Sequence, residues 1–399
     1  MKLWLIKCGK VLNAIRRDGL WHGLAKAVHG LVTTARMMVV PSGDILIITS
    51  GIGDSARYRA HHVAEELRNS GLRVSVTVQD NPFLPRYARR FRVFIFHRVL
   101  YMGRARALYD AAKAAGKTII FETDDLVYDP AFLAHMDFYN QMHSFERMQY
   151  EHGVGGEMVR DPYVKVATTT TSFLAAKLRE EGKEVFIVPN KLSARDVARA
   201  EELFAQKNYA ETETVTIGYF SGVISHNKDF ATLTPVLIRL FDTYAQLRIA
   251  IYGPLDLVPE LSPYADRFVQ HVYVPREKHF ANVAAVDINI APLEIGNPFC
   301  EAKSELKFFE AGIVGVPTVA AATQTFREAI THGTDGFTAA TQDEWVSHLG
   351  ALIESAALRE RIGTAARATA LRRYTTTSPD AHNMAYEEFL RTAIAGPSL

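Results

Sequence analysis

Short apolar runs alternate with amphipathic segments along almost the whole chain, and this alternation limits the possible folds more than any other feature. Uninterrupted apolar runs of this length are typical of strands buried on both faces of a parallel sheet. Six runs in the first half begin at Asp44, Leu72, Arg92, Lys117, Val164 and Glu184. Five more follow at Val215–Phe220, Leu247–Tyr252, Gln270–Val274, Val286–Pro292 and Thr318–Ala320. Two successive groups of strand–helix units predict an α/β protein with two Rossmann-like domains.

Length, charge and cysteine content exclude several classes of protein. A chain of 399 residues is too long for one hydrophobic core, which supports two domains. A net charge of +1 argues against nucleic acid as a general partner. The two cysteines, Cys8 and Cys300, have neither the spacing of metal ligands nor that of a disulfide framework, so we expect a cytoplasmic protein without a metal or other cofactor. The sequence contains no stretch of eighteen apolar residues, so it predicts no membrane span.

The first forty residues differ from the rest in charge. They contain seven basic side chains and one acidic one, Asp18, and their apolar residues, with Trp4 and Trp21, fall on the faces of two short amphipathic helices. Basic helices with tryptophan suit an anionic lipid surface, so residues 1–40 predict peripheral binding at the inner face of the cytoplasmic membrane. The alternative is that these helices pack on the core, and the sequence favours neither.

The segment Asn297–Ala320 places one glutamate at the carboxyl edge of the second predicted sheet. It follows an apolar run, and Ser304 is a suitable N-cap for a helix with Glu305 in its first turn. A Gly-Val-Pro sequence that ends at Pro317 stops this helix before the next strand. Glu310 should therefore point toward the edge of the sheet where ligands bind in open α/β folds.

This order of strand, loop, helix, Gly-Val-Pro and strand resembles the donor-sugar site of retaining glycosyltransferases of the GT-B fold, in the large family 4 group. The resemblance implies two Rossmann-like domains with parallel sheets that face each other across a cleft. It covers residues 43–395. In that family two glutamates are separated by seven residues: the second binds the ribose of the nucleotide, and the first touches the transferred sugar. Glu310 corresponds to the second, but Ala302 stands at the first.

The domain boundaries follow from the pattern and from the resemblance together. A polar, alanine-rich helix after Asn190 marks the junction between the sheets. We expect an acceptor domain over residues 41–195 and a donor-nucleotide domain over 196–379. The resemblance implies that a C-terminal helix over 380–397 crosses back and completes the first domain.

Polar residues follow the predicted strands of the acceptor domain. The first strand leads into a glycine loop with Gly51 and Gly53, then Arg57 and Arg59, which resembles a cleft-facing loop of the family. The loop lacks the third glycine of a dinucleotide-binding fingerprint, so a nicotinamide cofactor gains little support. We expect at least one of the two arginines to contact the cleft; the alternative is that both lie on the surface.

The next strands of the same sheet end in the candidate catalytic residues. His97 and Arg98 end one strand, and the following strand ends in an acidic block that contains Asp124 and Asp125. Because neighbouring strand residues point to opposite faces, the two aspartates should not act together. By resemblance, one of them binds or deprotonates an acceptor hydroxyl, and the other caps the next helix.

The second domain should supply the phosphate contacts. Its first strand ends in a glycine turn with Ser221 and Gly222, and a later strand ends at Gly253. The family usually has an arginine shortly after the first glycine and a lysine about five residues on; here only Lys228 fits. Three further residues of the Asn297–Ala320 segment complete the predicted donor site: Lys303, Ser304 and Lys307.

The resemblance implies a metal-independent retaining transferase that moves a hexosyl or deoxyhexosyl group from a nucleotide diphosphate to a polysaccharide or lipid-linked oligosaccharide. The route it implies is substitution on one face of the sugar, with the leaving phosphate accepting the acceptor's proton. Two alternatives remain open from the sequence. One is a nucleotide-sugar epimerase of the same architecture, and the other is a non-catalytic sugar-nucleotide-binding relative, which the missing first glutamate supports.

Overall fold

The structure, a computed structural model, describes residues 30, 32–136, 139, 142, 147, 149–210, 213–221, 227–271, 276–378 and 381–396. Most of the N-terminal segment predicted over residues 1–40 lies outside the described residues, as does Gly222.

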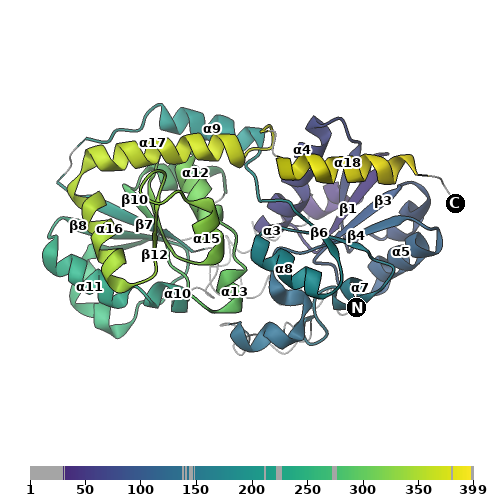
Figure 1. The fold of residues 1–399 in the computed structure, drawn as a ribbon, viewed down its shortest axis with the longest axis horizontal. Helices are drawn as coiled ribbons and strands as arrows, with labels where there is room; N and C mark the ends of the chain where they lie inside the picture. The colour runs from purple at the N-terminus through teal and green to yellow at the C-terminus, as the bar shows by residue number, and fades with distance from the viewer. Residues whose placement is uncertain are drawn as a thin grey trace.

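Two six-stranded parallel sheets organise the chain, as the alternation of apolar runs predicts (Figure 1). The first sheet has the order β2-β1-β3-β4-β5-β6, with strands β1 (Ile45–Thr49), β2 (Val74–Val78), β3 (Val93–His97), β4 (Thr118–Glu122), β5 (Val166–Thr169) and β6 (Glu184–Ile187). The second has the order β12-β11-β10-β7-β8-β9, with β7 (Val215–Phe220), β8 (Leu247–Tyr252), β9 (Phe268–His271), β10 (Ile288–Ala291), β11 (Thr318–Ala321) and β12 (Phe337–Ala339). The predicted α/β class is confirmed.

Helices cover both sheets. Those that belong to the first sheet in sequence are α3 (Asp54–Ala56), η1 (Arg57–His62), α4 (Val63–Asn69), η2 (Leu84–Arg89), α5 (Gly103–Ala114), η3 (Leu126–Tyr128), η4 (Pro130–His135), α7 (Gly156–Arg160) and α8 (Ser172–Glu180). The second unit has α9 (Ala194–Phe204), α10 (Asn227–Ala231), α11 (Thr234–Thr243), η7 (Pro259–Arg267), α12 (Arg276–Ala284), α13 (Pro298–Glu301), α14 (Leu306–Gly312), α15 (Gln324–Ala329), α16 (Gln342–Glu354) and α17 (Ala356–Arg373).

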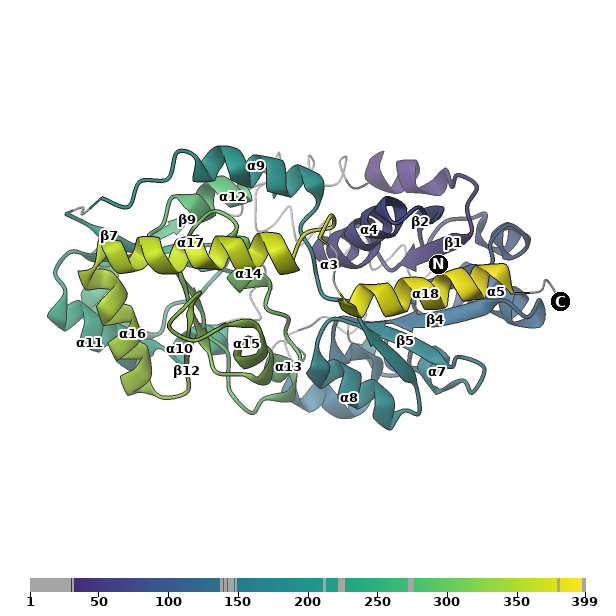
Figure 2. The same ribbon diagram turned by 45° about the horizontal axis from the view of Figure 1, so that its top comes forward.

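The last helix, α18 (Ala381–Ala395), returns to the first sheet. Figures 1 and 2 show α17 on the second unit and α18, which follows it, on the first. Tyr386 and Leu390 of α18 are buried against apolar residues of the first sheet such as Ile45 and Ile120. This burial fixes the end of the chain to the domain in which it begins.

The described part of the N-terminal segment packs on the edge of the first sheet. Met37 and Val40 are buried. The Thr77 hydroxyl of β2 donates a 2.9 Å hydrogen bond to the Met37 carbonyl. Residues 32–40 follow the two predicted helices, whose apolar residues lie outside the described part of the chain, so the choice between core packing and membrane contact stays a prediction. No helix among the residues that the structure describes is long and apolar enough to cross a membrane.

The second sheet differs from prediction at its edges. Strand β9 begins at Phe268 instead of Gln270, and β12 at the opposite edge was not predicted. β12 has only three residues, too few for a periodic pattern to identify it.

Candidate functional site

A cavity of about 530 Å³ lies between the two domains. Gly53, Asp54, Ser55 and Tyr58 line it from the first domain, and the second contributes Phe220, Ser221, Tyr252, Gly253, Arg276, His279, Asn282, Ala291, Pro292, Leu293, Lys303, Ser304, Leu306, Lys307, Glu310 and Phe326. Both walls are built by the carboxyl ends of strands and the helices that follow them, which is where open α/β sheets bind ligands.

Glu310 is the most strongly held charge in this cavity. Its carboxylate accepts a 2.5 Å hydrogen bond from the Tyr58 hydroxyl across the domain boundary and pairs with Arg276. His279 Nε2 lies 3.1 Å from its other oxygen. Burial alone would raise the pKa of Glu310, but the charges of Arg276 and His279, with the hydrogen bonds from His279 and Tyr58, outweigh it and hold the pKa well below its usual range.

The start of α14 differs from the sequence prediction. Glu305, not Ser304, occupies the N-cap position, and no side chain caps the helix. The Ser304 hydroxyl instead accepts a 3.0 Å hydrogen bond from Asn190 of the first domain. Ser304 therefore joins the two domains at the cavity wall, a contact that local sequence cannot reveal.

Two lysines bring positive charge to the cavity. Lys303 Nζ lies 3.4 Å from Asp125 of the first domain, and this carboxylate raises the pKa of Lys303. Burial lowers the pKa of Lys307, whose ammonium lies 5.8 Å from the Tyr219 ring centroid. A bound dianionic group would offset that burial cost, so Lys307 is well placed for phosphate.

Asp124 is the centre of a polar cluster on the first domain. It accepts a 2.7 Å hydrogen bond from Ser55 and pairs with Arg98 at 3.2 Å; His97 Nε2 lies 3.5 Å away. Burial opposes the charge on Asp124, but Arg98 and His97 outweigh it and hold the pKa well below the usual value. Asp124 is thus an anion at neutral pH, with little tendency to take up a proton.

The backbone of Arg98 supports this cluster. Its φ of 48° is left-handed, the only positive φ of a non-glycine residue in the part of the chain that the structure describes. Such backbone strain is costly and persists where surrounding contacts fix it. The ion pair with Asp124 is one of those contacts.

The structure separates the roles of the two adjacent aspartates. Asp125 is the N-cap of η3, where its side chain accepts a 2.9 Å hydrogen bond from the Leu126 amide. Asp124 faces Ser55, His97 and Arg98 instead. Asp125 thus has the expected capping position, but strand alternation is not the reason, because both aspartates lie beyond β4, which ends at Glu122.

Neither arginine of the glycine loop lines the cavity, which corrects the expectation that at least one of them does. Arg59 is buried and donates hydrogen bonds to Glu122, Asn190 and the Val188 carbonyl. It lies there because it compensates the buried carboxylate of Glu122 at the end of β4. Arg57 is partly exposed and lies 3.4 Å from Asp54.

The remaining predicted residues divide between the cavity and its surroundings. Gly53, Ser221 and Gly253 line it, whereas Gly51 precedes it in the same loop. At Gly253, with φ 114°, a Cβ atom would lie 1.9 Å from the Ser221 carbonyl oxygen, so only glycine fits. Lys228 is exposed on α10 and does not line the cavity, which corrects its assignment to phosphate.

Three residues that hold Glu310 were missed in the sequence. Arg276 and His279 stand three apart at the start of α12, so both reach one face of that helix. Tyr58 comes from η1 of the other domain. The i, i+3 spacing was visible, but the pairing with Glu310 depends on how α12 packs against α14.

The position of the family's first glutamate is closed to the cavity. Ala302 is buried and packs, with Phe299, against the apolar core of the first domain. A glutamate there would place a carboxylate among apolar side chains. This loop therefore fastens the two domains together.

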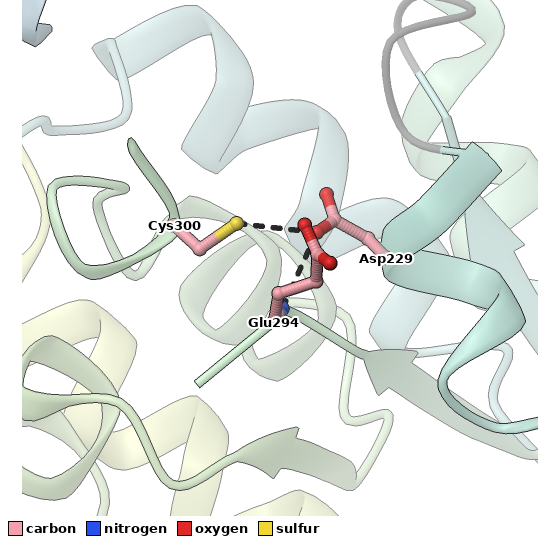
Figure 3. A group of neighbouring side chains, drawn as sticks. All are labelled: Asp229, Glu294 and Cys300. Atoms are coloured by element: carbon pink, nitrogen blue, oxygen red, sulfur yellow. Dashed lines mark hydrogen bonds between the residues drawn. The ribbon is translucent and has the colours of Figure 1, made fainter. Parts of the chain in front are cut away.

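A buried cluster behind the cavity brings together Asp229, Glu294 and Cys300, whose possible ligand atoms lie within 4.8 Å of one another (Figure 3). The Cys300 thiol donates a 3.2 Å hydrogen bond to Asp229, which also accepts from the Glu294 amide. Burial and Asp229 raise the pKa of this thiol, although a cysteine must lose its proton to bind metal. The cluster fixes the loop before α13 and offers a poor metal site.

Comparisons with known proteins agree with this geometry. Residues 236–379 match the family model described as glycosyl transferase-like. No curated protein matches the sequence. Sucrose-phosphate synthase from Thermosynechococcus elongatus superposes with a TM-score of 0.61 at 12% identity, over 88% of this chain and 99% of that one. A glycosyltransferase from Rickettsia africae gives 0.60 at 12% identity, over 89% and 100%. Anabaena HepE with UDP-glucose gives 0.58 at 14%, over 88% and 100%.

The chain has the two-domain fold of these structures, the GT-B fold of glycosyltransferases. The family match covers its second domain, and the two facing parallel sheets extend the likeness over almost the whole chain. The predicted fold is confirmed, and the match over residues 236–379 supports the predicted enzyme class; membership of family 4 stays a prediction.

The depressed pKa values of Glu310 and Asp124 predict acid lability. A carboxyl group whose pKa is lower in the folded state contributes stability above its unfolded pKa, about 4, and this is lost as pH falls toward the folded value. We expect the free energy of unfolding, measured by urea denaturation, to fall steeply below about pH 4. A smaller decline should begin below about pH 6.5, because burial lowers the pKa of His62 and His348 in the folded state. Equal stability at about pH 7 and pH 3 would contradict the two buried carboxylates.

Proposed function

We propose that the protein is a retaining glycosyltransferase that moves a sugar from a nucleotide-diphosphate donor to a polysaccharide or lipid-linked oligosaccharide. The observation that supports this most is the cavity itself, with Glu310, Lys303 and Lys307 on one wall and the Asp124 cluster behind the other. UDP sugars are the first donors to test, because the similar Anabaena protein was solved with UDP-glucose.

The donor is proposed to lie on the second domain. Glu310 would accept hydrogen bonds from the ribose hydroxyls, which requires Tyr58 or Arg276 to give up its present contact. Lys303 and Lys307 would face the diphosphate, with Ser221 and Gly253 forming the cavity floor. Prearranged cations matter here because the leaving phosphate gains charge in the transition state.

The acceptor is proposed to enter beside Ser55 and Asp124. The bond between the sugar's anomeric carbon and the phosphate oxygen breaks while a bond to the acceptor oxygen forms on the same face. The acceptor's proton passes to the leaving phosphate. Asp124 is a weak base because of its low pKa, so we assign it to binding the acceptor hydroxyl or orienting His97.

The proposed chemistry uses no metal, since two lysines supply the charge that a divalent cation would otherwise bring to a diphosphate. One observation favours a second candidate. Buried Ala302 leaves the sugar without the glutamate contact found in the family, which suits a protein that binds a sugar nucleotide without transferring it.

A thermal-shift screen of UDP, GDP, dTDP and CDP sugars tests the donor site. A true donor at about 100 times its dissociation constant should stabilise the fold by about 2.7 kcal/mol. Lys307→Met should weaken binding of that donor by about 1.5–3 kcal/mol, because a hydrogen bond to a charged group is lost. Lys228→Met, outside the cavity, is the matched control. If both variants bind every donor equally well, Lys307 does not contact phosphate.

A further inference from the structure

Large apolar side chains that are exposed gather on one flank of the first domain. Of nine such side chains in the described part of the chain, five lie there: Val32, Val39, Ile52, Phe83 and Met102. Three of them form what we call the loop rim. Ile52 follows β1, Phe83 follows β2 and Met102 follows β3, and they are 38%, 44% and 40% exposed.

One buried glutamine holds the three loops of this rim together. Gln79 Nε2 donates a 3.0 Å hydrogen bond to the Ser50 carbonyl in the first loop. Its Oε1 accepts a 3.1 Å hydrogen bond from the Leu100 amide in the third, while Gln79 itself belongs to the second. The rim is therefore a fixed surface and not three independent loop tips.

Positive charge surrounds the loop rim. Residues 79–110 contain seven arginines and two aspartates, although the whole chain has a net charge of only +1. The Arg86 guanidinium lies 5.2 Å from the Phe83 ring centroid. Exposed arginines lie on η2 and α5, the helices that follow the second and third loops of the rim: Arg86, Arg89, Arg104 and Arg106. Arg106 faces Asp110 at 3.5 Å, so the net effect comes mainly from the others.

The basic N-terminal segment joins the molecule at this place. A Cβ atom built on Gly30 would lie 3.4 Å from Ile52 Cδ1, so Gly30 lies beside the rim. Those 29 residues contain six basic side chains and one acidic one. Exposed apolar side chains ringed by arginine, with a basic segment attached, match the two requirements for binding an anionic lipid surface.

We propose that the loop rim docks on an anionic lipid bilayer, with Ile52, Phe83 and Met102 entering the headgroup region. Ile52 immediately precedes the cavity residues Gly53, Asp54 and Ser55. Docking would thus hold the cavity beside the bilayer surface, from which a lipid-linked acceptor is taken. The inference rests on the proposed transferase function and names the surface that its acceptor occupies.

Flotation of the full chain with phosphatidylcholine vesicles, with and without phosphatidylglycerol, tests the docking. The wild type should float only with the anionic vesicles, and less at high salt. Arg86→Gln, Arg89→Gln and Arg104→Gln together should weaken binding by about 100-fold, since each arginine near such a surface is worth about fivefold. Ile52→Ser, Phe83→Ser and Met102→Ser together should remove the salt-resistant part. Two double variants outside the rim are the controls. The control for the serine variant is Leu257→Ser with Val269→Ser, and the control for the arginine variant is Arg195→Gln with Arg372→Gln.

Vesicle binding by both rim variants at the wild-type level would overturn the proposal, as would a wild type that ignores anionic vesicles at low salt. A wild-type dimer that the serine variants convert to a monomer would show that a second copy covers the rim, which also overturns it. Donor binding separates this failure from that of the proposed function. Rim variants that bind donor normally but float normally refute the docking alone, whereas a wild type that binds no sugar nucleotide refutes the transferase.

Discussion

Replacing Glu310 by glutamine should lower the affinity for the donor nucleotide by about 1.5–3 kcal/mol, roughly 10- to 150-fold, because a charge-assisted hydrogen bond to the ribose is lost. It should also destabilise the fold by about 3 kcal/mol or more, since buried Arg276 loses its charge partner. Isothermal titration with the donor and urea denaturation measure the two effects separately.

Glu301→Gln is the matched control for this change. Glu301 is the last residue of α13, the helix before α14, but its oxygens accept from the Gly296 and Gln324 amides and it does not line the cavity. We expect its donor affinity to remain at the wild-type level. A Glu310→Gln variant that binds every nucleotide as tightly as the wild type would remove Glu310 from the donor site, whatever its effect on stability.

Replacing Asp124 by asparagine should lower the rate of sugar transfer by about 100-fold or more, while the donor affinity is retained. Groups that position or exchange a reacting proton usually contribute a factor of this size to the rate. The asparagine cannot balance Arg98 and His97, so the acceptor side loses its fixed negative charge. Steady-state kinetics with saturating donor measure the loss.

Asp125→Asn provides the comparison within the same acidic block. Asparagine keeps the cap of η3, because it is as good an N-cap as aspartate, and loses only the charge of the pair with Lys303. The replacement should therefore cost less than about 1 kcal/mol of stability and leave transfer close to the wild-type rate. If Asp124→Asn transfers as fast as Asp125→Asn, the Asp124 cluster is structural and the acceptor binds elsewhere.

Strand positions and the carboxyl-edge residues could be predicted because both follow from local pattern. Apolar runs fix where parallel strands lie, and the residue after each run must fall at the ligand-binding edge. Asp124 was placed in this way, whereas Glu310 and Lys307 were placed on the helix predicted within the Asn297–Ala320 segment. The alternation of strand side chains, from which the separation of Asp124 and Asp125 was predicted, does not apply, because both residues follow the end of β4 at Glu122.

The contacts between domains could not be predicted. Arg59 was predicted to contact the cleft because a glycine loop precedes it. In the structure it forms a buried ion pair with Glu122 instead. Tyr58 reaches Glu310 over a separation of 252 residues, which no local pattern encodes. From sequence alone a Glu310→Ala variant should keep its fold; the pairing with Arg276 makes a loss of stability the expected result.

The central claim is that the interdomain cavity transfers a sugar with retention, and nuclear magnetic resonance of a nucleotide-sugar panel with an acceptor extract tests it most directly. The account predicts that free nucleotide is released only when the extract is present and that the product keeps the donor's anomeric configuration. In the Asp124→Asn variant both the release of nucleotide and the formation of product should be about 100-fold slower. Conversion of the donor to an epimer without an acceptor would contradict it, as would donor binding with no turnover in any extract.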